Sequence, residues 1–182
     1  GVRKKDAMSL VTGKPVYTGD RVPAGALHVK LLRSPHAHAY IRAIDTSKAK
    51  MVPGVVCVLT WEDAPQSRFT TAGQTYPEPS PYDRLILDRL LRCAGDPVAI
   101  VAAETEAAAE RAVKMIRVDY EVRRPLLDFT QALDHEIVVH PEENFRALCD
   151  VGTDAKRNLV STEGFEVGDV EAELAKSDVV LE

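Results

Sequence analysis

The sequence predicts an α+β fold, a mixed sheet with two strand–helix–strand units followed by the start of a second domain. Three observations support this prediction. Segments of strand character twice flank a segment of helical character, and a strand–helix–strand connection is how neighbouring strands become parallel. The longest helical segment, over 105–116, carries its apolar residues on one stripe. The charge balance also changes near residue 150, as expected at a domain boundary.

The chain begins with a segment that predicts an extended, irregular lead-in, because residues 1–25 are rich in Gly, Lys and Asp and contain two turn signals. Residues 27–31 then alternate apolar and polar positions, which is the period of a half-buried strand. A second strand is predicted over 36–43. Its residues fall alternately on two faces, formed by Ala37, Ala39, Ile41 and Ala43 and by His36, His38, Tyr40 and Arg42.

A short helix is predicted next. Asp45 or Thr46 can cap it, since a side-chain oxygen there satisfies free backbone N–H groups, and Pro53-Gly54 follows its end. Residues 55–60 are apolar and β-branched, as expected for a strand covered on both faces. Cys57, within this strand, is expected to be a buried and inert thiol.

The segment 61–84 breaks this pattern, and residues 85–91 are apolar without a clear helix or strand period. In the first of these segments, prolines alternate with polar residues, which favours an extended polyproline-like loop. These residues are Pro77, Glu78, Pro79, Ser80 and Pro81. They could bind an SH3-like partner, but a surface loop is the favoured interpretation.

The second strand–helix–strand unit begins at Gly95-Asp96-Pro97, a sharp turn into a small apolar strand over 98–103. Thr105 is expected to cap the helix, and Glu106 suits the positive N-terminal end of the helix dipole. The apolar stripe of this helix consists of Ala109, Ala112, Val113 and Ile116, and alternation resumes with Val118, Tyr120 and Val122 on the last strand.

Beyond residue 134 the pattern thins to an apolar run at 137–139 and a capped helix at 169–175. Residues 150–182 hold nine acidic and three basic residues, whereas residues 1–149 hold 19 acidic and 20 basic ones. The chain starts with Gly1 and closes with Val179-Val180-Leu181-Glu182, which resembles the first half of a strand. From these features we expect a piece of a longer protein.

Composition argues against several classes of function. The formal net charge of −5 disfavours a nucleic-acid binder, and no apolar run approaches the roughly 18 residues needed to span a bilayer. Cys57, Cys93 and Cys149 are odd in number and contain no C-x-x-C pair. A disulfide framework and cysteine-held metal clusters are therefore not expected, and a reducing cytoplasm fits best.

The pair His36 and His38 is the most tempting metal site, because residues i and i+2 of a strand point the same way about 7 Å apart. A catalytic zinc needs a third ligand, which the neighbourhood lacks. We therefore interpret both histidines as residues of a half-exposed strand. His135 and His140, five residues apart in an aperiodic segment, form a weaker candidate.

Other chemistry has less support. Ser34 and His36 would lie side by side on a strand rather than in line, and the chain contains no G-x-S-x-G elbow. Gly95-Asp96-Pro97 lacks the pattern of a phosphate loop. The scattered carboxylates occupy predicted caps and turns without forming an acid/base pair, and they include Asp45, Asp63, Asp88 and Asp96. The spacing of residues assigns no catalytic, cofactor-binding or metal-binding residue.

Short motifs nevertheless follow one another through the chain in a specific order. They are Val11-Thr12-Gly13-Lys14, Tyr17-Thr18-Gly19-Asp20, Leu32-Arg33-Ser34-Pro35-His36-Ala37-His38-Ala39, Ile44-Asp45-Thr46-Ser47-Lys48-Ala49, Pro53-Gly54-Val55, Leu59-Thr60, Glu62-Asp63, Pro65, Gly95-Asp96-Pro97-Val98-Ala99, Val101-Ala102-Ala103-Glu104-Thr105, Val118-Asp119-Tyr120-Glu121, Asn158 and Gly168-Asp169-Val170-Glu171. This ordered set covers essentially the whole chain and resembles the molybdenum-binding subunit of xanthine dehydrogenases and aldehyde oxidoreductases.

The resemblance implies a domain organisation. Residues 1–14 would be a lead-in, residues 15–133 an α/β hammerhead domain, and residues 134–182 a linker and the truncated start of the molybdenum-cofactor-binding domain. The enzymes resembled hydroxylate purines, N-heterocycles or aldehydes with oxygen taken from water. Their glutamate base, glycine-rich cofactor contacts and substrate-orienting residue match no position in this chain, so the isolated chain is expected to be inactive.

The resemblance also implies cofactors and partners. The parent enzyme would carry a molybdopterin-type molybdenum cofactor, with [2Fe-2S] clusters and optionally FAD on other domains or subunits. The partners of this chain would be the remainder of the molybdenum subunit, the iron–sulfur and flavin parts, and further copies of the parent enzyme. This chain would then serve as scaffold and subunit interface. The alternative is a free-standing, non-catalytic protein-interaction domain of the same fold.

Overall fold

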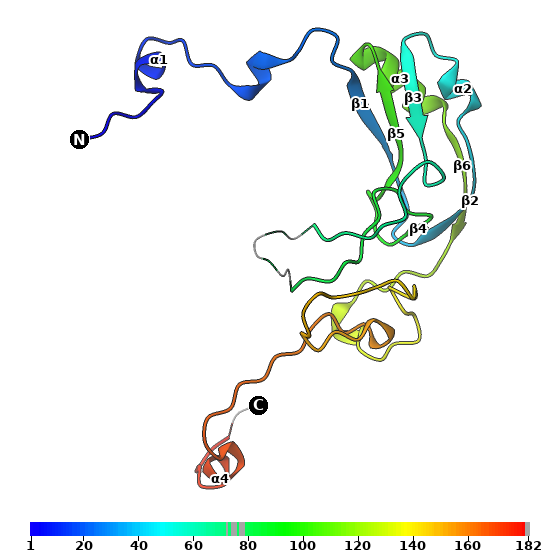
Figure 1. The fold of residues 1–182 in the computed structure, drawn as a ribbon. Coiled ribbons are helices and arrows are strands. Elements are labelled where there is room, and N and C mark those ends of the chain that lie inside the picture. The colour runs from blue at the N-terminus through cyan, green and yellow to red at the C-terminus, as the bar shows by residue number, and fades with distance from the viewer. Residues whose placement is uncertain (72, 74–75, 77–78, 181–182) are drawn as a thin grey trace. The chain divides into compact units, whose positions relative to one another are not determined.

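The structure of the chain is a computed structural model, in which residues 1–71, 73, 76 and 79–180 are described (Figure 1). The chain divides into two units. Unit 1 comprises residues 1–64 and 89–122, and unit 2 comprises residues 65–88 and 123–182. None of the described helices is long and apolar enough to cross a membrane.

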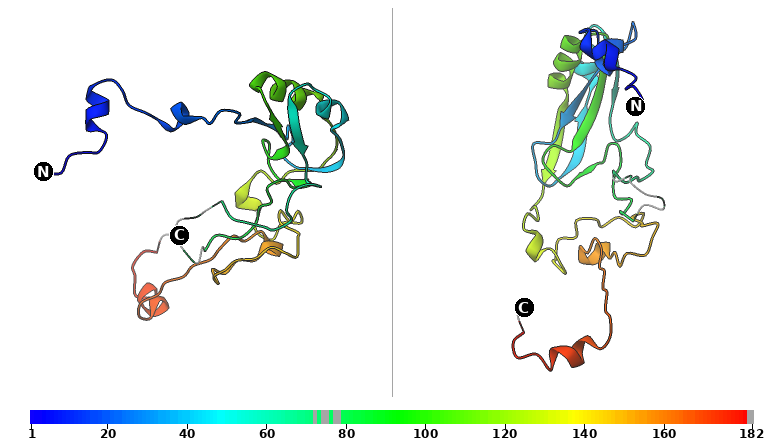
Figure 2. Two further views of the ribbon diagram at one scale, coloured as in Figure 1. Left: turned by 45° about the horizontal axis from the view of Figure 1, so that its top comes forward. Right: turned by 90° about the vertical axis from the view of Figure 1, so that its left-hand side faces the viewer.

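The first sheet of unit 1 has three antiparallel strands in the order β1-β5-β3. Its strands are β1 (His28–Arg33), β3 (Val55–Leu59) and β5 (Pro97–Ala103). The helix α3 (Glu106–Met115) lies behind this sheet in Figure 1 and to one side of it in the right-hand view of Figure 2. Small residues of β5 and α3 allow the helix to approach closely, and their buried cluster includes Ala99, Val101, Ala103, Ala109 and Ala112.

The second sheet is also antiparallel, with the order β4-β2-β6. Its strands are β2 (Ala39–Asp45), β4 (Leu90–Leu91) and β6 (Arg117–Val122). Arg89 stabilises this sheet through cation–π contacts. Its guanidinium carbon lies 4.6 Å from the ring centroids of both Tyr40 and Trp61. Its Nε also donates to the carbonyl oxygen of Ile41 at 2.9 Å, so that one cation links the strand to the loop after β3.

Local signals placed the helices α2 (Ser47–Lys50) and α3 of unit 1 correctly. Thr105 caps α3, since its hydroxyl accepts a hydrogen bond from the Ala108 backbone N–H at 3.2 Å. The helix α2 follows Asp45, whose Oδ1 accepts from the Ser47 backbone N–H at 2.9 Å. These contacts satisfy backbone groups that a helix start leaves free. Gly54 then adopts a φ of +85° just before β3, a conformation that favours glycine.

The α+β class is confirmed, but the expected parallel pairing across the two strand–helix–strand units is wrong. All the named strand pairs are antiparallel. The reason lies in the connections: α2 joins β2 to β3 and α3 joins β5 to β6, and in both cases the two strands belong to different sheets. A crossover makes strands parallel only when both return to the same sheet.

The faces of two strands also differ from the prediction. His36 and His38 precede β2, in a bend rather than on the strand. The register shifts between Ile41 and Ala43, so Ala43 is exposed instead of sharing the buried face of Ile41. β3 is not covered on both faces, because Val58 is buried while Val56 and Leu59 are exposed. Cys57 is therefore only partly buried.

The lead-in is less irregular than expected, since it contains the helix α1 (Ala7–Val11) and a 3-10 turn at Thr18–Arg21. In unit 2 the described regular elements are 3-10 turns at Phe129–Gln131 and Ala155–Arg157 and the helix α4 (Val170–Leu174). The predicted cap of α4 is confirmed, because Asp169 Oδ1 accepts from the Ala172 N–H at 3.0 Å.

Two predictions fall partly on residues that lie outside the described ones. They concern Pro77 and Glu78 of the proline-rich loop and Leu181 and Glu182 of the final half strand. Val179 and Val180, which are described, form no strand.

Unit 2 is held by polar contacts rather than by a hydrophobic core. Among its described residues, Leu87 is the one hydrophobic side chain that is buried. Asn158, at a φ of +58°, donates to the carbonyl oxygens of Ala132 and Ile137 and accepts from the backbone N–H of Val139. Large apolar side chains are instead exposed on this unit, among them Leu127, Phe129, Phe165 and Val167. We therefore expect another protein surface to cover the exposed apolar side chains of unit 2.

Candidate functional site

The turn between β1 and β2 holds the residues that sequence analysis considered most closely. The Ser34 hydroxyl donates to the carbonyl oxygen of His36 at 2.9 Å and accepts from the His36 backbone N–H at 3.1 Å. The imidazole of His36 packs edge-on against Tyr120, with 5.0 Å between ring centroids. Burial raises the pKa of this tyrosine above its ordinary value. Ser34 therefore shapes the turn through backbone contacts, which is not the geometry of a nucleophile and its base.

The Gly95-Asp96-Pro97 turn is a second candidate, and its carboxylate is engaged in the turn itself. Asp96 Oδ2 accepts from the backbone N–H groups of Arg92 and Cys93 at 2.7 and 3.0 Å. Gly95 adopts a φ of +95°, and its backbone N–H donates to the carbonyl oxygen of Ser34 at 2.8 Å. The motif thus fixes the entry to β5 and ties it to the Ser34 turn.

The other two acidic candidates of unit 1, Asp63 and Asp45, also bond the backbone. Asp63 Oδ2 accepts from the Thr60 backbone N–H at 2.8 Å and from its hydroxyl at 3.1 Å. These hydrogen bonds, the backbone one first, hold the pKa of Asp63 below its ordinary value, and contacts to Ser47 likewise lower the pKa of Asp45. Neither carboxylate pairs with a second one as general acid and base would.

We predict that Asp63 makes unit 1 sensitive to acid. Since its pKa is lower in the folded than in the unfolded chain, its contribution to stability is complete above the unfolded value of about 3.9 and is lost as the pH falls through the folded value. Wild type should therefore unfold at a higher temperature than Asp63→Asn at pH 7, with the gap closing on acidification. Thermal melts between neutral and acidic pH measure this, with Glu62→Gln as a control for loss of a neighbouring charge. A gap that stays constant with pH would contradict it.

In unit 2, a polar cluster around the nearly buried side chain of Arg68 joins residues 65–88 to residues 123–182. The Arg68 side chain is 6% exposed, and its Nη1 lies 3.1 Å from Oε1 of Glu142, which is 14% exposed. The same Oε1 lies 3.0 Å from Nδ1 of His140, and Nε of Arg68 donates to Oδ1 of Asn144 at 2.6 Å. All these groups are partnered within the cluster, and Asp88 and Asp83 complete it at 4.0 Å from Arg68 and His140.

The sequence did not predict this cluster. The weaker candidate pair of His135 and His140 is not formed, because the imidazole of His135 accepts from the Ile137 backbone N–H at 3.0 Å while that of His140 contacts Glu142. Arg68 and Asn144 lie 76 residues apart, so no local spacing could signal their contact. Among the described residues, no group of three or more His, Cys, Asp or Glu side chains is arranged to hold a metal ion.

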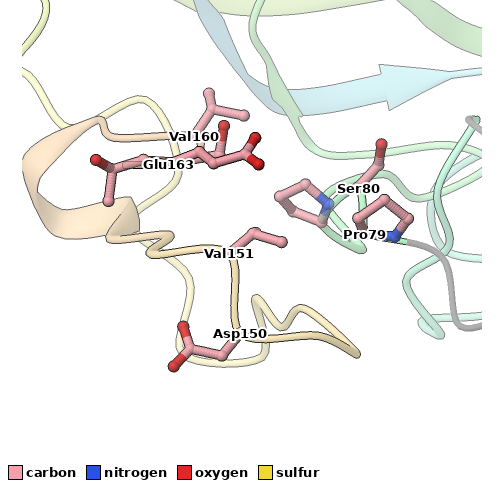
Figure 3. Close-up of a pocket in the computed structure, with 9 residues that line it drawn as sticks. Pro79, Ser80, Asp150, Val151, Val160 and Glu163 are labelled. Atoms are coloured by element: carbon pink, nitrogen blue, oxygen red, sulfur yellow. The ribbon is translucent and has the colours of Figure 1, made fainter. Parts of the chain in front are cut away.

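Unit 2 also has an open pocket with a volume of about 470 Å³ (Figure 3). Pro79 and Ser80 lie on one side, and Val151 points toward them from the other. The nine lining residues in the described part of the chain include the carboxylates Asp150 and Glu163 and no cation. This lining does not fit a phosphate-bearing cofactor such as molybdopterin, because it would repel the negative charge.

Comparison with known proteins identifies what this fold is similar to. Residues 12–124 match the family described as "Aldehyde oxidase and xanthine dehydrogenase, a/b hammerhead domain". The chain is 37% identical over 203 residues to the "Probable hypoxanthine oxidase XdhD" of Escherichia coli K12, covering 98% of this chain and 21% of that protein. It is 41% identical over 120 residues to the "Xanthine dehydrogenase molybdenum-binding subunit" of Escherichia coli O157:H7, covering 64% of this chain and 16% of that protein.

Solved structures show the same similarity. The aldehyde oxidoreductase of Desulfovibrio gigas superposes with a TM-score of 0.62 at 32% identity, over 75% of this chain and 16% of that one. A Cu,Mo-CO dehydrogenase superposes with a TM-score of 0.66 at 28% identity, over 98% of this chain and 22% of that one. The chain therefore spans about a fifth of the length of the proteins it resembles.

Proposed function

Since the chain belongs to the aldehyde oxidase and xanthine dehydrogenase family through its a/b hammerhead domain, we propose that it is the N-terminal part of the molybdenum subunit of a molybdenum hydroxylase. In that enzyme it acts as scaffold and subunit interface. The parent enzyme hydroxylates a purine, an N-heterocycle or an aldehyde with oxygen taken from water. The residues of this chain perform none of that chemistry.

One observation carries the proposal: 98% of this chain aligns with 21% of a probable hypoxanthine oxidase. Two structural features support it. Three of the polar side chains considered as catalytic candidates, Ser34, Asp96 and Asp63, bond the backbone at turns. The described residues of unit 2 also leave large apolar side chains exposed, as expected for a surface that another part of a larger protein covers.

The proposal extends to cofactors and surroundings. The molybdenum cofactor, when bound, supplies the hydroxylation chemistry and belongs to parts of the subunit outside residues 1–182. Iron–sulfur clusters and optionally FAD lie on other domains or subunits, with which this chain assembles. Cys57, Cys93 and Cys149 form no disulfide with one another, which is in keeping with a reducing cytoplasm.

We predict that the isolated 182-residue chain binds no molybdenum and oxidises neither hypoxanthine nor aldehydes. The physical reason is that Ser34, Asp96 and Asp63 are engaged in hydrogen bonds at turns, and that the described residues include no group of three or more His, Cys, Asp or Glu side chains arranged to hold a metal ion. Elemental analysis of the purified chain and assays with both substrates measure this, with a polypeptide continuing beyond residue 182 in the same reading frame as the positive control. Stoichiometric molybdenum in the isolated chain would contradict the prediction.

The reading frame after Glu182 separates this proposal from the alternative, a free-standing interaction domain of the same fold. A frame that continues for several hundred residues with glycine-rich cofactor motifs excludes the alternative. A stop codon directly after Glu182 excludes the proposal.

A further inference from the structure

The sheet β1-β5-β3 has one face that α3 covers and one that it does not (Figures 1 and 2). Ala99, Val101 and Ala103 of β5 point toward α3, since they belong to the same buried cluster as its alanines. Because side chains alternate along a strand, Ile100 and Ala102 point to the opposite face, which we call the outer face. The strand register assigns the neighbours of these two residues on that face.

Two rows of apolar residues cross the outer face from one edge strand to the other. One row consists of Val29, Ala102 and Cys57, and the next of Leu31, Ile100 and Leu59. Both rows are apolar across all three strands. Val29 is 56% exposed, Leu31 37% and Leu59 38%. Lys30, between the two β1 residues, points to the helix side instead, where its Nζ contacts Glu106 and Glu110 of α3 at 2.6 and 3.2 Å.

This pattern differs from that of a sheet with one face in water. Such a sheet places polar side chains on its solvent face, whereas the outer face carries Val, Leu, Ile, Ala and Cys. Each edge strand contributes an exposed large apolar side chain to it. Between them, Ile100 and Cys57 are partly exposed and the small side chain of Ala102 is 8% exposed. An apolar surface with large exposed side chains at both edges marks a contact surface.

The size of the patch indicates what kind of partner it fits. Three strands spaced about 4.8 Å apart and two rows about 7 Å apart give a patch of roughly 200 Å². A stable interface between separate proteins buries about 800 Å² on each partner. The patch alone is therefore too small to hold a second molecule, but it suffices for a segment of the same polypeptide, whose tether removes most of the entropy cost of association.

We propose that the outer face of the β1-β5-β3 sheet is the docking surface for an apolar segment of the same polypeptide that lies outside residues 1–182. The inference rests on the proposed function, in which this chain is part of a longer molybdenum subunit. It adds which face of the hammerhead domain receives the remainder of that subunit. The length of the relatives supports this occupant, because about four-fifths of the probable hypoxanthine oxidase has no counterpart in this chain, which spans 21% of it.

Cysteine labelling tests the proposal without any mutation, because Cys57 lies on the outer face and Cys93 is an exposed thiol elsewhere in unit 1. N-ethylmaleimide is applied to the 182-residue chain, to the complete molybdenum subunit alone and to the assembled enzyme, and mass spectrometry follows each cysteine. We expect Cys57 to react in the short chain and to react at least about tenfold more slowly in the complete subunit, since a covered thiol reacts only after local opening. Cys93 serves as the internal control for reagent and time.

Each other outcome overturns the proposal. Protection of Cys57 only in the assembled enzyme assigns the outer face to another subunit. Protection in the short chain that increases with protein concentration assigns it to a second copy. Equal reactivity in all three samples means that nothing covers the face. Molybdenum content of the complete wild-type subunit is measured in parallel, so that failure of the proposed function is seen independently of the labelling result.

A variant gives a second readout. Leu31→Lys puts a charge on a side chain that is already partly exposed in the short chain, so its melting temperature should change by no more than about 2 °C there. In the complete subunit the same lysine would be buried without a partner, and the melting temperature should fall several-fold further than in the short chain. Equal shifts in the two proteins would overturn the proposal.

Discussion

Ala109→Glu is expected to unfold unit 1. Ala109 is fully buried in the cluster that α3 forms with the β1-β5-β3 sheet, and small side chains in that cluster allow helix and sheet to approach. A glutamate there buries a charge without a partner, which costs about 3–5 kcal/mol. For a domain of this size that corresponds to a fall in melting temperature of roughly 15–30 °C, and circular dichroism melts measure it.

The matched control lies two residues away on the same helix. Ala107 is exposed, so Ala107→Glu adds the same side chain without burying it. Its position in the first turn places the carboxylate near the positive end of the helix dipole. We expect its stability to stay within about 0.5 kcal/mol of wild type. Equal melting temperatures for the two variants would show that α3 does not pack on the sheet through Ala109.

Arg68→Met is expected to make unit 2 open locally more often. The guanidinium of Arg68 links residues 65–88 to residues 123–182 through Glu142 and Asn144. Its removal leaves the buried carboxylate of Glu142 without this cation, a change that costs about 3–5 kcal/mol. With Leu87 as the one buried hydrophobic side chain among the described residues of this unit, little else opposes opening. Backbone amides near 82–84 and 140–146 should exchange roughly a hundredfold faster.

Two further variants make this test specific. Arg124→Met removes an exposed partner of Glu136, where both side chains are about three-quarters exposed; such pairs contribute at most about 1 kcal/mol, so exchange should hardly change. The double variant Arg68→Met with Glu142→Leu also removes the carboxylate that has lost its cation. It should recover part of the protection of the backbone amides against exchange. Exchange rates in Arg68→Met that equal those in Arg124→Met would mean that the cluster does not hold unit 2 together.

The sequence allowed α2, α3 and α4 to be predicted because their signals are local. Thr105 is followed by a stripe of apolar residues at helical spacing, and the cap is formed three residues along, at Ala108. The strands other than β4 were located for the same reason, whereas β4 lies in a segment whose type the pattern left open. Their pairing was not predictable from local pattern, because the partners are far apart in sequence, as His28 and Ala103 are. Only the pairing shows that the helices connect different sheets.

Two other features escaped prediction for definite physical reasons. The register shift between Ile41 and Ala43 inverts the faces of β2 halfway along, and nothing in an alternating pattern marks where a strand will bulge. The cluster of Arg68, His140 and Glu142 forms between segments that carry no periodicity, so its members look like ordinary surface charges in the sequence. The resemblance of the ordered motifs to the family is confirmed by the match over residues 12–124.

The central position of β5 in its sheet has a consequence for synthesis. β1 and β3 emerge from the ribosome first, yet each pairs with β5 and not with the other. Until residues 97–103 have emerged, β1 and β3 therefore have no strand of this sheet to pair with. Strand pairing over long sequence separations is also slow. The nascent chain is thus most exposed to aggregation before β5 emerges, and a chaperone that binds extended apolar segments would act during that interval.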